Sequence, residues 1–188
     1  MFGYSTKLED DEVLLRIFEG VDTQTRPPPK LAVRIRTPFE AARQGDLAKL
    51  KRFLTSKDTQ FDARSHDDAN GGSTILHHAA WAGDVQTLHY IIHHVRSTYG
   101  ESELRTFLNA TDTVCSRSTA LMEACRSNVG SVPERLECIR DLIDAGADTA
   151  AQDARGDTCL HKAVQGGFLP IVRLLTQGAN VRLLVVRQ

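Results

Sequence analysis

The strongest constraint on the fold is a short pattern that occurs three times in this 188-residue chain. Each copy begins with a threonine, has a leucine two residues later, and has an alanine three residues after the leucine. The copies start at Thr74, Thr119 and Thr158, and an apolar stretch follows each one. A weaker copy lies upstream, in residues 41–47. This repetition predicts a stack of similar units rather than one unique globular core.

Each residue of the pattern has a physical role in a pair of short helices. The threonine hydroxyl caps the first helix by accepting hydrogen bonds from its free backbone N–H groups. The leucine and alanines share one helix face, and the small alanines let a neighbouring helix approach closely. Gly83 and Gly167 can end the first helix in the left-handed conformation. One helix pair cannot bury its own apolar faces, so neighbouring pairs must stack.

The copies resemble the ankyrin repeat, whose signature reads Thr-Pro-Leu-His-x-Ala-Ala-x-x-Gly, followed by an apolar helix and Gly-Ala-Asp or Gly-Ala-Asn. The resemblance covers residues 36–181, and the closing tripeptides stand at 146–148 and 178–180. It implies an all-α ankyrin-repeat solenoid of about four helix-turn-helix repeats with short β-hairpin-like turns. The upstream copy lacks the hairpin and resembles an N-terminal cap.

The spacing of the copies departs from the family pattern. The threonines are separated by 45 and then 39 residues, whereas the ankyrin period is about 33. We therefore expect insertions near residues 96–107 and 128–134. Insertions in repeat proteins map to loops, often on a functional face.

The remaining segments flank the predicted repeat domain, residues 37–181. Residues 1–36 are expected to form an arm, with an acidic helix of net charge −4 over residues 1–25 and a proline spacer at residues 27–29. Residues 182–188 form an apolar tail. A solenoid needs a polar terminal cap, so this tail either folds back as a cap or is covered by something else.

Composition points to an ordinary globular protein, with 41% hydrophobic and 25% charged residues. The net charge of −1 gives no overall attraction to nucleic acid or anionic membrane. The first 20 residues lack the apolar core of a signal peptide, and no apolar run reaches the length of a membrane helix. The four cysteines have no C-x-x-C spacing, so we expect them reduced and buried. These features predict a cytoplasmic or nuclear location.

Five of the seven histidines lie between Ser73 and Val95, which raises the possibility of a reactive or metal site. His77 and His161 occupy the signature histidine, and the resemblance implies that they tie the hairpin turn to the first helix. His89 and His93 are spaced to chelate a metal, but the repeat frame places both on the solvent side without a third ligand. No catalytic motif is present either. The sequence therefore predicts no metal, no cofactor, no catalytic residue and no enzyme activity.

The resemblance implies that two variable positions late in each first helix face a concave, ligand-contacting surface. Trp81 falls at one of them, and tryptophan is enriched at binding hot spots because one rigid side chain buries a large area. Otherwise Trp81 covers the insertion after Val95 or is simply tolerated. The predicted partner-binding residues are Arg43, Gln44, Trp81, Ala82, His94, Arg126, Ser127, Arg155, Asp157 and Gln165.

These features predict a non-catalytic protein–protein interaction module or scaffold, acting as a subunit of a hetero-complex rather than a homo-oligomer. Its arginines suit an acidic or phosphorylated protein partner. The alternative is a regulator or adaptor that inhibits or recruits an enzyme, such as a ubiquitin-ligase substrate adaptor, with residues 1–36 as the second docking element. Residues 26–57 carry a net charge of +7, but nucleic-acid binding is disfavoured because no exposed aromatic platform accompanies them.

Overall fold

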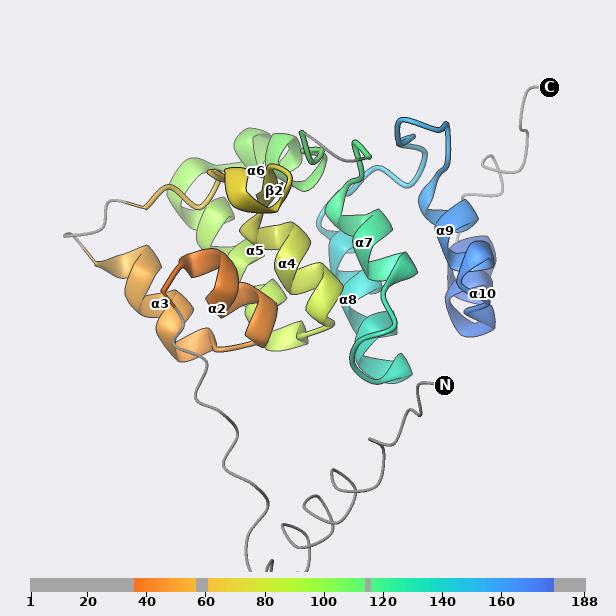
Figure 1. Ribbon diagram of the computed structural model, residues 1–188, viewed down its shortest axis with the longest axis horizontal. Coiled ribbons are helices and arrows are strands. Elements are labelled where there is room, and N and C mark those ends of the chain that lie inside the picture. The colour runs from red at the N-terminus through yellow and green to blue at the C-terminus, as the bar shows by residue number, and fades with distance from the viewer. Residues whose placement is uncertain (1–35, 57–60, 114–115, 178–188) are drawn as a thin grey trace, which may run out of the picture. The chain divides into compact units, whose positions relative to one another are not determined.

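The computed structural model describes residues 36–56, 61–113 and 116–177, all within one compact unit of the chain (Figure 1). The predicted arm therefore lies outside the described residues, apart from Arg36. The predicted tail at residues 182–188 also lies outside them, as does Cys115.

Helices dominate the described residues. Their bounds are α2 (Pro38–Gln44), α3 (Leu47–Thr55), α4 (Ile75–Ala82), α5 (Val85–Tyr99), α6 (Glu101–Leu108), α7 (Ala120–Arg126), α8 (Val132–Asp144), α9 (Cys159–Gln165) and α10 (Leu169–Gln177). Two short antiparallel strands, β1 (His66–Asp67) and β2 (Ser73–Thr74), flank a 3₁₀ turn, η1 (Asp68–Asn70). A single bridge between Thr111 and Thr119 marks the equivalent turn before α7.

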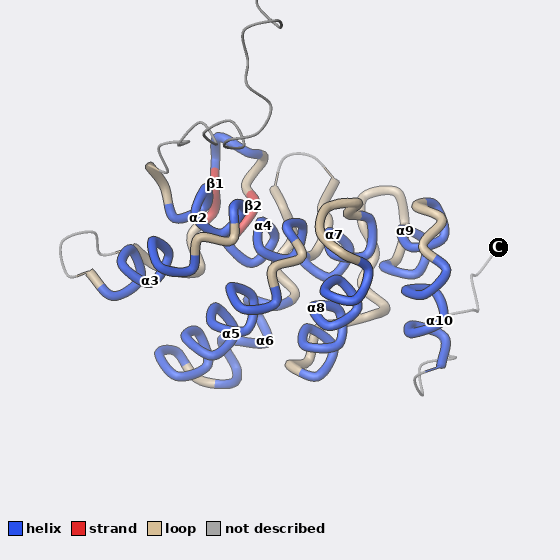
Figure 2. Tube along the Cα trace, turned by 90° about the horizontal axis from the view of Figure 1, so that it is seen from below, coloured by secondary structure: helices blue, strands red, loops and turns tan. Residues whose placement is uncertain are grey.

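The helices form two layers. The first helices of the four pairs, α2, α4, α7 and α9, contact one another in chain order and make the inner layer (Figure 2). Behind them, α8 contacts both α5 and α10 in the outer layer. The predicted all-α solenoid of four helix pairs with hairpin turns is confirmed.

Capping explains where the inner helices begin. Thr74 and Thr158 each form a reciprocal capping box with the histidine three residues later. Thr119 caps α7 by accepting a hydrogen bond from the Met122 backbone N–H. The upstream copy uses the same device, because Thr37 and Glu40 cap α2 reciprocally. These local contacts fix the start of each repeat.

Small side chains hold the inner layer together. Ala42, Ala80 and Cys125 occupy equivalent positions in successive repeats, and each is fully buried. The outer helices bury larger residues behind them, including Leu88, Ile139 and Ile171 in the same core. The core is therefore a continuous seam between repeats rather than a cluster inside any one of them.

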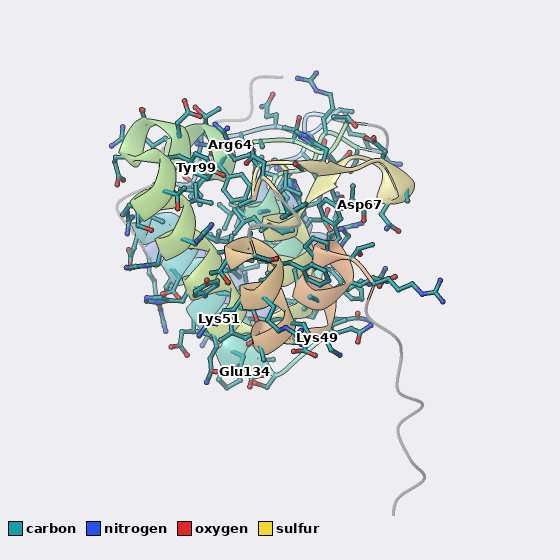
Figure 3. All side chains as sticks on the ribbon, turned by 90° about the vertical axis from the view of Figure 1, so that its left-hand side faces the viewer. Lys49, Lys51, Arg64, Asp67, Tyr99 and Glu134 are labelled. Atoms are coloured by element: carbon teal, nitrogen blue, oxygen red, sulfur yellow. The ribbon has the colours of Figure 1, made fainter. Side chains whose placement is uncertain are left out.

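The first insertion is not the predicted loop. Residues 101–108 form the additional helix α6, which packs against α5 with Leu104, Phe107 and Leu108 buried. The spacing of these three apolar residues is helical. Arg64 joins the insertion to the first hairpin, because it forms an ion pair with Glu103 at 2.7 Å and lies over the Tyr99 ring at 4.3 Å (Figure 3).

The second insertion, at residues 128–134, is a loop up to Ser131, and α8 begins inside it at Val132. The buried Arg135 holds this loop in place. Its guanidinium donates to the Ser127 carbonyl and lies 4.2 Å from the centre of the Phe168 ring. Arg135 thus satisfies the end of α7 and connects the third repeat to the fourth.

We expect Arg135→Ala to destabilise the fold by about 3 kcal/mol, because it leaves a cavity and an unsatisfied buried carbonyl. Urea unfolding measures the effect. The control is Arg140→Ala, which removes an exposed arginine from the same helix and should change stability by less than about 0.5 kcal/mol. Equal effects of the two variants would contradict the role given to Arg135.

Two glycines have the same backbone conformation but differ in how closely neighbouring residues pack around them. Gly83 and Gly167 have φ values of +71° and +70°. A Cβ at Gly83 would lie 3.2 Å from Arg135 Cγ, whereas a Cβ at Gly167 would meet nothing within 4 Å.

We expect Gly167→Ala to cost about 1 kcal/mol, from left-handed strain alone. Gly83→Ala should cost about 2 kcal/mol or more, because the second insertion must also move. The two unfolding midpoints in urea test this, and identical losses would show that the insertion does not press on Gly83.

Candidate functional site

The inner face is the exposed side of α2, α4, α7 and α9 together with the adjoining hairpin tips. One position late in each helix recurs along it, occupied by Arg43, Trp81, Arg126 and Gln165 in successive repeats. The preceding position is the buried seam described above, so these side chains stand at the edge of the core. The structure therefore brings four of the predicted residues into one row.

Trp81 lies in this row without belonging to the buried core. It is half-buried, and the Arg43 guanidinium lies 5.0 Å from the centre of its ring. This geometry is a cation–π contact between neighbouring repeats. The insertion helix α6 packs on α5 in the outer layer, so covering that insertion does not account for the position of Trp81 on α4.

In the third repeat, the Arg126 side chain is accessible to a partner, whereas the Ser127 side chain is not. Arg126 is exposed and hydrogen-bonds to Glu123 through Nε at 2.9 Å. Burial raises the pKa of Glu123, and the arginine opposes that shift. Ser127 is 2% exposed, and its hydroxyl donates to the Trp81 carbonyl at 2.5 Å. The prediction that Ser127 contacts a partner is wrong for its side chain, because that hydroxyl joins two repeats.

In the fourth repeat a network of ion pairs occupies part of the predicted site. Asp157 accepts hydrogen bonds from Lys162 at 2.9 Å and from Gln165 at 3.1 Å, and these contacts lower its pKa. Lys162 also lies 2.6 Å from the buried Asp153. Arg155 remains exposed on the hairpin tip. Of these residues, Arg155 is the one whose charge is free for a partner.

Gln44 and Ala82 lie where the surface holds none of the predicted arginines. They line a separate groove of about 590 Å³ at the C-terminal ends of α2 and α4. Its charged lining residues are Asp84, Glu134 and Glu137. The predicted site residues therefore belong to at least two surfaces of different charge.

His94 does not join the row on the inner face. It lies on the outer helix α5, half-buried, with its ring stacked on Tyr90 at 6.0 Å. Burial lowers its pKa. Beside this pair, Lys51 from α3, which is labelled in Figure 3, lies 5.0 Å from the centre of the Tyr90 ring.

The signature histidines have the predicted structural role. His77 accepts a hydrogen bond from the Thr74 backbone N–H at 3.2 Å, and its Nε2 lies 3.0 Å from the Ser118 carbonyl of the next repeat. His161 accepts from the Thr158 N–H in the same way. His89 and His93 are exposed, and His89 lies 3.9 Å from Asp141. Within the described ranges, no three His, Cys, Asp or Glu side chains are grouped to hold a metal ion.

Burial of His77 makes the stability depend on pH. Its side chain is 2% exposed, and burial lowers its pKa to about 4, although Asp112 opposes the shift. In the unfolded chain the pKa returns to about 6.5. Below about pH 6.5 the unfolded state therefore binds more protons than the folded state. The free energy of unfolding falls as the pH drops towards about 4.

We expect the free energy of unfolding to fall by about 3 kcal/mol through His77 between about pH 7 and pH 4. Urea unfolding at several pH values measures this loss. His77→Asn keeps a hydrogen-bonding side chain but cannot titrate, so its stability should depend less on pH across this range. Parallel curves for the two proteins would mean that His77 is not the titrating group.

Comparison with known proteins identifies the class. Residues 121–176 match the family model for ankyrin repeats that occur in many copies. No curated protein matches the chain. Residues 121–176 therefore contain ankyrin repeats, and the fold of the described residues is the ankyrin-repeat fold.

One solved structure illustrates the likeness. It is the crystal structure of the yeast ribosomal protein Rps3 in complex with its chaperone Yar1. The match has a TM-score of 0.65 and 24% identity, and covers 74% of this chain and 88% of that chain. Because 321 solved chains match in all, the fold by itself does not single out a partner. Among the described residues, no helix is both long and apolar enough to cross a membrane.

Proposed function

We propose that this chain is a non-catalytic protein-binding module that holds a partner protein on its inner face. The observation that carries the proposal is Trp81, which stands half-buried beside the core rather than within it. The equivalent positions in the other repeats hold Arg43, Arg126 and Gln165. A lone aromatic in a polar row is not needed to build the core, and it can bury a large area against a ligand.

The stacked geometry supports a polypeptide as the ligand. Repeat solenoids present extended surfaces rather than enclosed cavities, and an extended surface fits a protein segment better than a small molecule. A similar fold occurs in a complex of a ribosomal protein with its chaperone, which supports a protein partner for this chain as well. The exposed Arg126 and Arg155 suit a partner that is acidic or phosphorylated.

An exposed apolar face supports membership of a larger hetero-complex. Val164 occupies the seam position at which Ala42, Ala80 and Cys125 are buried by the next repeat, yet it is 59% exposed. Leu169, on the adjoining helix, is 57% exposed. Large apolar side chains exposed to this extent favour contact with a further surface.

The alternative function is a regulator or adaptor that recruits or inhibits an enzyme. It requires a second docking element, which residues 1–36 would have to supply. The described residues support the first proposal through Trp81 and the exposed arginines, whereas residues 1–35 of the segment that the alternative needs lie outside them.

We expect Trp81→Ala to weaken capture of the partner by thirtyfold or more, in the range of a hot-spot residue (about 2 kcal/mol). Tagged wild-type and variant chains are incubated with cell lysate, and the proteins retained are quantified by mass spectrometry. Thermal unfolding of the variant should stay close to that of wild type, since Trp81 lies outside the core.

The matched control is Tyr90→Ala, which removes a half-buried aromatic from the outer helix α5. Partners retained by this control but lost from the Trp81 variant would support the inner face as the binding surface. Equal retention by both variants would remove Trp81 from the site.

A further inference from the structure

Arg117 has a backbone conformation that the fold does not favour for arginine. Its φ is +54°, and within the described ranges it is the one non-glycine residue with a positive φ. Counting back from the capping threonine, the same position in the other repeats holds Gly72 and Gly156, with φ values of +72° and +83°. A glycine would suit this turn better. Folding therefore does not explain the arginine, and strain of this kind is characteristic of functional sites.

A backbone hydrogen bond places Arg117 beside Arg155. The Ala154 N–H donates to the Ser116 carbonyl at 2.8 Å, which joins the hairpin tips of the third and fourth repeats. Each arginine is the next residue along its own hairpin, and both are exposed. Figure 1 shows the turns before α7 and α9 at the same end of the inner layer. Neither guanidinium has a hydrogen-bond or ion-pair partner among the described residues.

Below these tips lies a groove of about 420 Å³ between α7 and α9. Its lining includes Arg126, Arg155 and Lys162, against one carboxylate, Asp153. That carboxylate is already neutralised, because Lys162 lies 2.6 Å from it and the Asp153 side chain is 1% exposed. Arg126 uses Nε and one Nη with Glu123, which leaves its other Nη free. The groove therefore keeps guanidinium donors for a ligand.

We propose that this groove binds an acidic segment of a polypeptide partner, with carboxylates held by Arg126 and Arg155 in its lining and by Arg117 at its edge, between the lining residues Ser116 and Ser118. This inference rests on the proposed function and names the chemistry of the partner. Planar guanidinium groups bind carboxylates through paired hydrogen bonds. Arg126 shares its repeat position with Trp81, so the same segment can continue along the inner face and place an apolar side chain on the indole. The lining has no aromatic ring on which bases could stack, so a peptide fits better than a nucleic acid.

A labelled peptide tests the groove directly. The probe is a fluorescein-labelled peptide of alternating glutamate and glycine, titrated with the full chain at low salt and followed by fluorescence anisotropy. We expect Arg155→Gln and Arg117→Gly each to weaken binding about tenfold, and added salt to weaken binding to wild type. Arg140→Gln, which removes an exposed arginine from the outer helix α8, should bind like wild type.

Arg117→Gly also separates binding from folding. Because glycine fits the positive φ, this variant should unfold at the same temperature as wild type or higher while binding the peptide less well. The inference is overturned if the Arg155 and Arg117 variants both bind like wild type or if Arg140→Gln weakens binding equally. It is also overturned if a glutamine–glycine peptide binds as tightly, or if single-stranded RNA competes more strongly than the glutamate peptide.

The outcomes distinguish this inference from the proposed function. Loss of partner capture in Trp81→Ala, with normal capture in the two arginine variants, would keep the binding module and reject the acidic segment. Peptide binding that depends on the arginines, with unchanged capture in Trp81→Ala, would keep the groove and remove Trp81 from the site.

Discussion

The close packing of small side chains between neighbouring inner helices is the constraint on which the rest of this structure depends. Ala42, Ala80 and Cys125 are fully buried at one repeat position, and a large side chain there would force the repeats apart. Side chains that differ in chemistry from one repeat to the next are therefore confined to positions outside this seam. The next residue of each inner helix and the hairpin tips provide those positions, and they carry Trp81 and the arginines.

The repeat pattern could be read from the sequence because its residues act locally. Capping threonines and buried alanines depend on neighbours a few positions away, so three copies were enough to predict the solenoid. The insertions could not be read in the same way, since they follow no repeat. Residues 101–108 form a helix, although a loop was expected, and the signal was the spacing of Leu104, Phe107 and Leu108. Pairing of Arg64 with Glu103 across 39 residues could not be inferred from the sequence.

The candidate site was predicted in part, and the errors have physical causes. Two inner helices end at left-handed glycines, whereas α7 ends at Ser127 with φ −63° and ψ 142°. That extended ending leads into the second insertion and turns the serine hydroxyl towards the Trp81 carbonyl. Arg117 was not predicted as a site residue. In the sequence, the one sign that its position is unusual is that the equivalent positions of two other repeats hold glycine, Gly72 and Gly156. Its positive φ becomes visible only in the structure.

Some polar residues of the inner layer are paired with other residues of the fold, and others have no such pairing. His78 lies 3.3 Å from Asp67 of its own hairpin, and Lys162 is held by Asp153 and Asp157. His78 and Lys162 already lie against carboxylates of their own repeats, so a partner gains little from them. Trp81 lies outside the buried core, against the exposed Arg43 guanidinium. Arg117 and Arg155 have no hydrogen-bond or ion-pair partner for their guanidinium groups among the described residues, and Arg117 adopts a conformation that glycine would adopt more easily. Because none of these three residues belongs to the buried core, we infer that partner recognition is concentrated in them.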